Sequence, residues 1–362
     1  MIKELKLTNF KCFKNITIPI KNISFMTGGN GAGKSSVIQS FLLSMATIKT
    51  NEEIIGLNGP YMLSLGTQKL TLSEEHTTEE IIIEVIGEHE SLKCIYNANN
   101  PEQESIDVLS KENVDFIEKY DYFYLNAERM GPRRYFHNQH NTDINVGFSG
   151  EFTASTLLNH DKWGSETHAD NFLFEFANNK RPLKVAEYWM DFVCPGTEIS
   201  IKTYEDLGIS DLQFKNPLGV SKPTISTGFG LTYVFPIIVS CVLLSLLKDK
   251  TGVLLVENPE AHLHPFGQSR IGKLLAIAAL SGVQIIVETH SEHVINGARL
   301  EMLKYNATDN MIVNFFSGHN NNYEIQNITL KEDGELIDWP AGFFDQDIED
   351  LKEILKIRSC KK

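Results

Sequence analysis

Nine consecutive residues decide the fold of this 362-residue chain: Gly28-Gly29-Asn30-Gly31-Ala32-Gly33-Lys34-Ser35-Ser36. They contain the Walker A pattern Gly-x-x-x-x-Gly-Lys-Ser, in which a glycine-rich turn opens a helix and wraps around phosphate groups. An apolar run at residues 23–27 precedes the turn, and apolar residues at helical spacing follow it. Because the motif requires a strand before it and a helix after it, the alternative of a turn without a ligand is disfavoured.

The parts of this loop have distinct expected roles. The backbone N–H groups from Gly31 to Ser35, at a helix N-terminus, would point at anionic oxygens. Lys34 would reach the β- and γ-phosphates of a nucleotide, and the Ser35 hydroxyl would ligate Mg²⁺. The loop does not say what the nucleotide is used for, so the rest of the chain must decide.

A second apolar strand, expected at residues 252–256, ends in the polar residues Glu257, Asn258 and Glu260. In phosphate-loop enzymes this place holds the Mg²⁺-associated carboxylate, usually followed by an acidic residue that activates water. Glu257 takes the first place. Asn258 stands at the second, where an amide can orient a water molecule but cannot accept its proton, and Glu260 is the nearest carboxylate that could compensate. The alternative, a polar strand end in solvent, is weakened because ligands bind at this edge of parallel sheets.

A third strand, expected at residues 283–288, leads to His290. Its spacing from the strand at 252–256 fits one strand–helix–strand crossover, which predicts parallel pairing of the two. His290 could then approach a γ-phosphate, although a lone histidine after a strand is more often structural.

A second glycine-rich turn lies ahead of a helix expected at about 230–247. Its residues Thr227, Gly228 and Gly230 would expose N–H groups to another phosphate. We do not expect one chain to bring both turns to the same nucleotide, so the second turn is assigned to a partner subunit.

Two further clusters suggest metal sites at first sight. His262 and His264 are separated by one residue, but no Cys or third His lies at ligand spacing, which favours a loop that forms hydrogen bonds across an interface. The acidic run from Asp345 to Asp350 is better explained as a solvated helix start.

Composition restricts the class of protein. The chain has 33 Lys+Arg and 47 Asp+Glu, a formal charge of −14, which argues against a nucleic-acid coat or an anionic-membrane binder but leaves a local basic patch possible. The five cysteines lack C-x-x-C spacing, and the N-terminus has no signal-peptide pattern, so a reducing cytoplasm is expected. Between Lys222 and Lys248 no residue is charged; a buried helix is favoured there over a membrane span.

The pattern is regular α/β at both ends and weaker in the middle, which predicts one α/β domain split by a mixed α+β insertion. The expected divisions are 1–70 and 223–330 for the two parts of the domain, 71–222 for the insertion and 331–362 for a tail. Within the insertion we expect a β-hairpin at 81–86 and 91–96, a strand at 120–125, and then a mostly helical arm with helices near 166–178 and 183–193.

This set of motifs resembles the ABC-type ATPase heads of the SMC, RecF and OLD group, and most of all their short stand-alone bacterial members, AAA family ATPases often associated with phage defence. The resemblance covers about 1–70 and 223–348. It is carried by Leu7–Phe13, the Walker A loop, the signature-like Thr227–Gly230, the Glu-Ala-His-Leu-His-Pro run at 260–265, Thr289–Ser291 and Trp339–Gln346, with Asn126–Arg133 as the only match in the middle.

The resemblance implies a P-loop NTPase head that dimerises head to tail and sandwiches two ATP molecules with Mg²⁺. Lys34 and Ser35 would bind phosphate and metal, Glu257 would take the Mg²⁺-associated role, and His290 would be the switch histidine. Lys11 would approach the nucleotide, and the second glycine-rich turn would close on the partner's ATP. The sequence departs from the family's motifs in two places. The Glu257-Asn258 pair replaces the usual Asp-Glu, which puts the hydrolysis rate in doubt, and the signature is not literally Leu-Ser-Gly-Gly-Gln. Gln68 is a weak candidate for the Q-loop glutamine.

Three functions compete on this basis. The leading hypothesis is an ATPase whose nucleotide-driven homodimer, or higher oligomer, regulates DNA binding or a partner effector nuclease or toxin; no nuclease domain of its own is expected. The second is a scaffold that binds ATP and hardly hydrolyses it, and the third is a transporter subunit, which the departures disfavour. DNA contact would rest on two basic clusters, for which surface salt bridges are an equally good explanation: Arg129, Arg133 and Arg134, and Lys180, Arg181 and Lys184.

Overall fold

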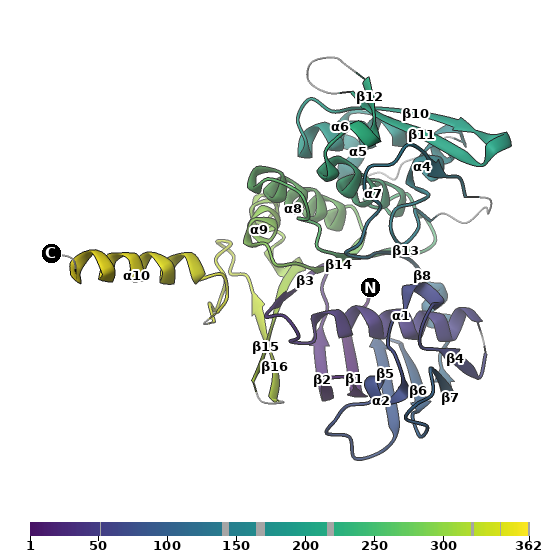
Figure 1. The fold of residues 1–362 in the computed structure, drawn as a ribbon, viewed down its shortest axis with the longest axis vertical. Coiled ribbons are helices and arrows are strands. Elements are labelled where there is room, and N and C mark those ends of the chain that lie inside the picture. Colours follow the sequence, from purple (N-terminus) through teal and green to yellow (C-terminus); the bar gives the residue numbers. More distant parts are fainter. Residues whose placement is uncertain are drawn as a thin grey trace.

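The structure is a computed structural model that describes residues 1–50, 52–139, 145–163, 171–215, 221–319, 322–340 and 342–360. Figure 1 shows two sheets stacked on either side of a long helix, a helical region above them, and a C-terminal helix that extends away from the rest.

The central sheet carries the phosphate loop. Its six strands lie in the order β16-β15-β3-β14-β13-β8. They span Ile23–Gly28 (β3), Tyr120–Leu125 (β8), Thr251–Glu257 (β13), Gln284–Glu288 (β14), Met311–His319 (β15) and Asn322–Thr329 (β16). β14 pairs in parallel with β3 on one side and with β13 on the other, which confirms the parallel pairing predicted from the crossover spacing. The helix of that crossover is α8, Pro265–Leu280.

A second sheet lies below the central sheet, and α1 (Lys34–Thr50) lies between the two (Figure 1). Its order is β2-β1-β5-β6-β7-β4, with antiparallel pairing throughout. The strands span Glu4–Phe10 (β1), Phe13–Pro19 (β2), Ile54–Gly56 (β4), Glu80–Ile86 (β5), Ser91–Asn97 (β6) and Ser105–Glu112 (β7). The predicted hairpin at 81–86 and 91–96 is confirmed as β5 and β6.

Burial on both faces explains why the central strands have continuous apolar sequences. Side chains alternate along β13: Val253 and Leu255 belong to the core shared with α1 and the second sheet, whereas Leu254 and Val256 belong to the core under the helices. The molecule therefore has two hydrophobic cores separated by the central sheet. Ligands of such sheets bind at the carboxyl ends of the parallel strands, which is where the candidate site is expected.

α7 (Phe229–Leu244) and α8 pack on the other face of the central sheet. The helices α4 (Thr153–Trp163), α5 (Phe172–Ala177) and α6 (Pro182–Val193) pack against these two, and a small third sheet packs against α4 and α6. The third sheet has the order β10-β11-β12, with β9 paired to β11. Its strands span Phe136–His137 (β9), Glu198–Tyr204 (β10), Ile209–Lys215 (β11) and Ser221–Pro223 (β12).

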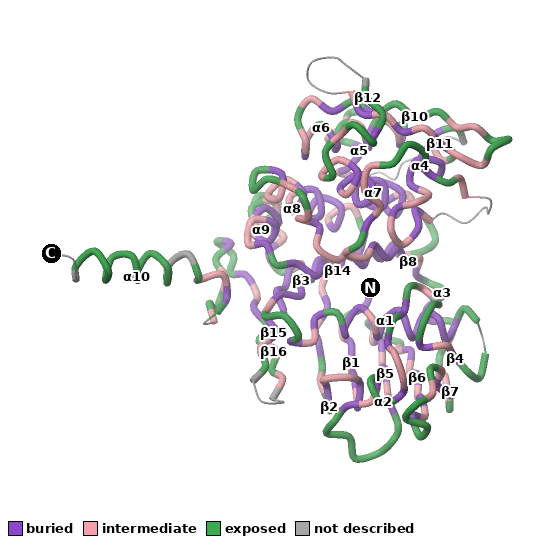
Figure 2. Tube along the Cα trace, viewed as in Figure 1, coloured by how far each residue is buried: buried purple, intermediate pink, exposed green. Residues whose placement is uncertain are grey.

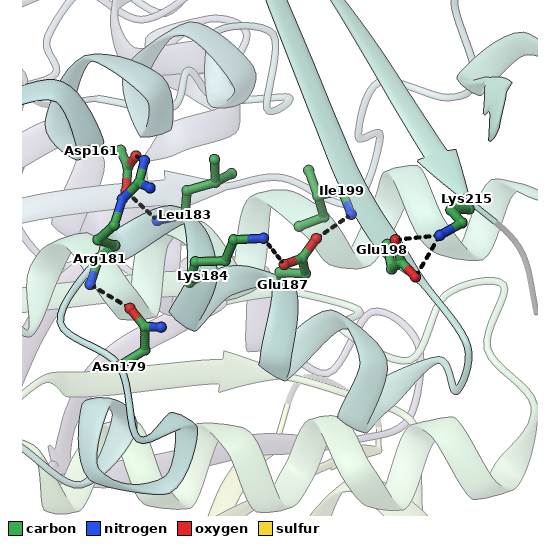
Figure 3. A network of polar contacts seen from close by, with 9 residues as sticks. All are labelled: Asp161, Asn179, Arg181, Leu183, Lys184, Glu187, Glu198, Ile199 and Lys215. Atoms are coloured by element: carbon green, nitrogen blue, oxygen red, sulfur yellow. Dashed lines mark hydrogen bonds and ion pairs between the residues drawn. The ribbon is translucent and has the colours of Figure 1, made fainter. Parts of the chain in front are cut away.

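Polar contacts fasten α6 to its neighbours (Figure 3). Asp161 of α4 accepts a hydrogen bond from the Arg181 guanidinium and another, of 3.1 Å, from the backbone N–H of Leu183. Glu187 in the middle of α6 accepts 3.0 Å from the backbone N–H of Ile199 on β10. These bonds join α4, α6 and β10 into one unit.

The long uncharged run forms α7, as expected for a buried helix: most of its residues, from Thr232 to Leu244, are buried. Within the described part of the chain, no helix combines the length and apolar character needed to cross a membrane.

The segment expected as an insertion, 71–222, contributes strands to both large sheets. The segment after residue 71 supplies β5, β6 and β7 to the second sheet, and β8 to the edge of the central sheet beside β13. The arm that follows is also less helical than expected, because it contains the third sheet. Local apolar patterns predict strands but not their partners, which are set by distant segments. The helix expected at 183–193 is α6; the one near 166–178 lies partly outside the described residues, and α5 is its described part.

The remaining helices lie after β14. α9 (Glu292–Lys304) packs along α8, whereas α10 (Gln346–Cys360) extends from the body and is exposed along most of its length (Figure 2). Short helical segments complete the described structure: η1 (Pro60–Met62), α2 (Gln68–Thr71), α3 (Asp115–Glu118), η2 (Glu205–Leu207), η3 (Thr224–Ser226) and η4 (Thr308–Asn310).

Candidate functional site

The phosphate loop occupies the turn between the end of β3 and the start of α1. Gly28 has a φ angle of 137°, and a Cβ atom there would lie 2.0 Å from the carbonyl oxygen of Phe316 on β15. Gly33 has a φ angle of 99°, and a Cβ atom there would lie 2.5 Å from the ring of Phe13. Only glycine can occupy these two positions, so the tight loop is specified by its sequence.

Lys34 is held directly over the loop. It is 4 % exposed, and its Nζ donates hydrogen bonds to the carbonyl oxygens of Gly28 (3.1 Å) and Gly29 (2.7 Å). Burial lowers the pKa of Lys34, and the Glu288 carboxylate opposes this shift. The ammonium group is thus positioned where a phosphate held by the loop would meet it.

Ser35 contacts a carboxylate that the sequence reasoning did not assign. Its hydroxyl donates a 3.0 Å hydrogen bond to Oε1 of Glu288, the last residue of β14. Glu288 is 7 % exposed, and its other oxygen, Oε2, has no hydrogen-bond partner among the described residues. Burial, and then repulsion from the Glu257 carboxylate, raise the pKa of Glu288 to about 7 against the opposing effects of Ser35 and Lys34.

A cavity of about 510 Å³ opens beside the loop, a size that suits a small-molecule ligand. Several expected site residues line it together with Glu288: Lys11, Asn30, Gly31, Gly33, Lys34, Ser35, Ser36 and His290. Gly28 and Gly29 line a smaller neighbouring cavity, and His290 lines both cavities. Ala32 is buried within the loop. The Lys11 ammonium donates a 2.7 Å hydrogen bond to Gln39 of α1 at the cavity wall.

Glu257 is not among the lining residues of this cavity. The Tyr124 hydroxyl donates a 2.9 Å hydrogen bond to its Oε1, and the backbone N–H of Ala127 donates one of 3.3 Å to its Oε2. Burial raises the pKa of Glu257, whereas these two bonds and the charge of Arg129 lower it. Both carboxylate oxygens therefore accept hydrogen bonds, one from the end of β8 and one from the segment that follows it.

Arg129 lies inside the molecule, which corrects its assignment to a basic surface cluster. It is 3 % exposed, and its guanidinium donates hydrogen bonds to the carbonyl oxygens of Asn126 (2.9 Å), Glu257 (2.6 Å) and Asn258 (2.6 Å). Burial lowers the pKa of Arg129 to about 10. In the other cluster, Arg181 pairs with Asp161 and Lys184 with Glu187, as the salt-bridge alternative expected.

Three buried acceptor atoms end neighbouring strands without a hydrogen-bond donor among the described residues: Asn126 Oδ1 after β8, Asn258 Oδ1 after β13 and Glu288 Oε2 on β14. Asn258 has a φ angle of 43°, and its backbone N–H donates a 2.8 Å hydrogen bond to the Glu288 carbonyl oxygen. Of these three residues, Glu288 is the one that lines the phosphate-loop cavity. A buried carboxylate oxygen without a donor suits a hard cation such as Mg²⁺, so Glu288 fits the metal that a phosphate loop requires.

Glu260 fixes the segment after β14. Its Oε2 accepts a 2.7 Å hydrogen bond from the Thr289 hydroxyl, and its Oε1 accepts 2.9 Å from the backbone N–H of His290. Because both oxygens are engaged in this way, the geometry supports a structural role for Glu260 in placing His290 at the cavity. Burial and the charge of Lys34 lower the pKa of His290, and Glu260 opposes them.

The second glycine-rich turn does not meet the phosphate loop. Thr227 and Gly228 line a separate cavity of about 400 Å³, together with Lys215 and Lys222. A Cβ atom at Gly228 would have no atom within 4 Å, whereas one at Gly230 would lie 2.8 Å from the His262 carbonyl oxygen. One chain thus holds two separate glycine-lined pockets.

The histidine pair has packing and capping roles. The His262 ring lies 4.6 Å from the Tyr233 ring, and His264 caps α8 by accepting from the backbone N–H of Phe266. Among the residues that the structure describes, no group of three or more His, Cys, Asp or Glu side chains could hold a metal ion.

The sequence analysis did not single out Glu288 or Tyr124, and it gave Gln68 as a weak candidate for the Q-loop glutamine. Gln68 is fully buried, and its amide bonds to the backbone of Ser105 and Asn100, away from the cavity. A signal for Glu288 was present, since it ends a strand at the sheet edge that binds ligands. Its significance depends on β14 lying next to β3, which the sequence does not state.

Solved structures to which this chain is similar include SMC heads. The chain is similar to an Smc head domain with an extended coiled coil, bound to the C-terminal domain of ScpA derived from Pyrococcus furiosus; the TM-score is 0.56, with 13 % identity, 98 % coverage of this chain and 99 % of that one. It is also similar to an SmcHead bound to the C-winged helix domain of ScpA, with a TM-score of 0.53, 13 % identity and coverage of 91 % and 98 %. These likenesses confirm the α/β P-loop ATPase head fold.

A curated relative is the OLD nuclease of Thermus scotoductus, 21 % identical over 341 residues. The match includes 84 % of this chain but only 61 % of that nuclease. The resemblance to the SMC, RecF and OLD group is therefore confirmed at the level of the shared ATPase.

Two family descriptions match the chain. Residues 307–354 match the "Protein of unknown function (DUF3696)" family. Residues 23–296, which make up most of the chain and include the phosphate loop, Glu288 and His290, match the family described as "AAA domain, putative AbiEii toxin, Type IV TA system". The protein belongs to this AAA-domain family, and so to the ATPases of the SMC, RecF and OLD type.

Proposed function

We propose that this chain binds ATP with Mg²⁺ in the phosphate-loop cavity and hydrolyses it, and that two copies close head to tail around two nucleotides to control an effector. The observation that carries the proposal is the convergence of Lys34, Ser35, Glu288 and His290 on one cavity beside a glycine-rich loop. Such a site positions a triphosphate and offsets its charge, which is most of what phosphoryl transfer requires from a protein.

Each group has a defined task in this reaction. Backbone N–H groups of the loop and Lys34 hold the phosphate oxygens, and His290 approaches the terminal phosphate from the end of β14. When bound, Mg²⁺ would neutralise charge that develops on the phosphates. Asn258, whose side-chain oxygen has no donor among the described residues, can orient the attacking water but cannot take its proton.

The amide at position 258 favours slow turnover. A nucleotide-gated scaffold that binds ATP and hydrolyses it rarely is therefore the second candidate, and it shares the site and the dimer with the first. The two differ in turnover alone, so one set of measurements on the purified protein separates them.

The effector is proposed to be a partner protein, such as a nuclease or toxin in phage defence, rather than DNA itself. Of the two basic clusters, one contains the buried Arg129 and the other is largely neutralised by Asp161 and Glu187. A net charge of −14 adds long-range repulsion of phosphate backbones. The similarity to an OLD nuclease supports a nuclease as the effector, and a cytoplasmic location agrees with this role.

Lys34→Ala tests the function. Loss of this ammonium group should weaken ATP binding about tenfold or more and abolish any turnover, as measured by calorimetry and by phosphate release. The matched control is Lys93→Ala, because Lys93 lies on β6 in a surface ion pair with Glu84, and both properties should be unchanged there.

The outcomes separate the candidates. Wild-type protein that neither binds nor hydrolyses ATP would refute the proposal, whereas ATP-dependent dimerisation without turnover would establish the scaffold. Duplex DNA should give no gel shift at low salt with or without ATP; a salt-sensitive shift would make DNA the direct ligand.

A further inference from the structure

Two carboxylates, the partly buried Glu257 and the buried Glu288, end neighbouring strands of the central sheet, and of these two only Glu288 lines the phosphate-loop cavity. Glu257 on β13 and Glu288 on β14 stand opposite each other in the strand register. β14 pairs directly with β3, the strand that leads into the loop, whereas β13 lies one strand farther away. The strand order therefore brings Glu288 to the loop and keeps Glu257 behind it.

We propose that Ser35 and Glu288 hold the Mg²⁺ ion of the bound nucleotide, and that Glu257 is a positioning residue rather than a metal ligand. This inference rests on the proposed function, and it moves the metal-binding carboxylate from β13 to β14.

The contacts of Glu288 are those expected of a metal ligand. Its Oε1 accepts the 3.0 Å hydrogen bond from the hydroxyl of Ser35, the loop residue whose oxygen coordinates the metal in this motif. Its Oε2 is buried and has no donor among the described residues, yet the side chain lines the cavity that contains Lys34 and Ser35. Burying a carboxylate oxygen without a hydrogen-bond donor or a cation costs free energy of folding. The unpaired Oε2 of Glu288 therefore points to a cation as its missing partner.

The contacts of Glu257 point to a different role. Its two carboxylate oxygens are occupied by the Tyr124 hydroxyl and the Ala127 N–H, at 2.9 Å and 3.3 Å. Its carbonyl oxygen accepts from Arg129, which also binds the Asn258 carbonyl oxygen. Glu257 thereby links the segment after β8 to the end of β13 and fixes the backbone that carries Asn258.

The charges around the loop complete the argument. Glu257 and Glu260 both repel negative charge on Glu288, and Lys34 is the cation that acts on it from the loop. A divalent cation between Ser35 and Glu288 would offset this repulsion while leaving Lys34 for the phosphates.

The test uses full-length protein, ADP and Mn²⁺, with free Mn²⁺ counted by electron paramagnetic resonance. Glu288→Gln should weaken Mn²⁺ binding to the protein–ADP complex about tenfold or more, because one charged ligand becomes an amide. ADP binding in chelator should stay within about twofold of wild type, since the loop and Lys34 are unchanged.

The matched variants are Glu257→Gln and Tyr124→Phe. Both should leave Mn²⁺ affinity within about twofold of wild type, and they should lower kcat together if Glu257 acts only by positioning. Glu288→Asp, which keeps the charge, should recover part of the Mn²⁺ affinity. Should Glu288→Gln not fold, Ser35→Ala removes the other proposed ligand and should weaken Mn²⁺ in the same assay.

Three results would overturn the assignment: unchanged Mn²⁺ affinity in Glu288→Gln, unchanged affinity in Ser35→Ala, or a loss in Glu257→Gln as large as that in Glu288→Gln. Each leaves ADP binding by the wild type intact and so spares the proposed function. Wild-type protein that binds neither ADP nor ATP refutes the function and this inference together.

Discussion

At the scale of single residues, Arg129 shows how a charged side chain can build a site without entering it. Its guanidinium binds three backbone carbonyl oxygens, on Asn126, Glu257 and Asn258, and lies over the Tyr233 ring at 5.3 Å. These contacts hold the ends of β8 and β13 together, so the backbone of both segments depends on one cation.

Arg129→Met should therefore lower the free energy of unfolding by about 3 kcal/mol or more, because three carbonyl groups lose a charged donor. Urea denaturation provides the measurement. Arg134→Ala is the control, since Arg134 is exposed, and it should change stability by less than about 0.5 kcal/mol. Equal effects of the two substitutions would show that Arg129 contributes no more than a surface residue.

At the scale of elements, the contact between α8 and α9 connects the end of β13 to the end of β14. Two glycines allow the helices to touch: a Cβ atom at Gly272 would lie 2.0 Å from the Val294 carbonyl oxygen, and one at Gly297 would lie 2.0 Å from that of Ser269. Because α9 begins right after His290, any separation of these helices would displace the histidine from the cavity.

Gly272→Ala should lower the free energy of unfolding by about 1–3 kcal/mol, the usual cost of overpacking, and should also reduce turnover. Gly267→Ala is the control on the same helix, because a Cβ atom there meets its nearest neighbour at 3.6 Å. That variant should be as stable as the wild type or slightly more stable, because alanine has a higher helix propensity than glycine. Thermal unfolding of both proteins decides the matter; a Gly272→Ala protein as stable as the Gly267→Ala protein would contradict this account of the packing.

At the scale of the whole molecule, the phosphate loop and the second glycine-rich turn line two separate cavities. If ATP contacts both the phosphate loop and the second glycine-rich turn, as we propose, each nucleotide site must be completed by the turn of a second copy. A two-fold dimer supplies two such composite sites. Gly228 allows a clean test because a side chain there would clash with nothing in its own subunit.

Lys34→Ala and Gly228→Asp proteins should each be inactive alone, since every composite site lacks one half. An equal mixture should regain about a quarter of wild-type turnover, because half of the dimers are mixed and each mixed dimer has one intact site. Phosphate release from the mixture provides the measurement. A mixture as inactive as its components, with mixed dimers present, would show that the sites are not shared between subunits.

What the sequence determined by itself is local. The phosphate loop is readable because glycine, lysine and serine at fixed spacing dictate a turn, and the strand before and helix after it have their own periodicities. The same holds for the parallel pairing of β13 and β14, which follows from the length of one crossover, and for the burial of α7, which follows from its lack of charge.

What only the tertiary structure decided is which of these polar groups meet. Glu257 and Glu288 end similar apolar strands and look equivalent in the sequence, yet Glu288 contacts Ser35 and Glu257 contacts Tyr124. Arg129 reads as a surface cation and is buried. The physical reason is that the order of strands in a sheet is set by burial of apolar faces between distant segments, and that order, rather than any local pattern, assigns each strand end its neighbours.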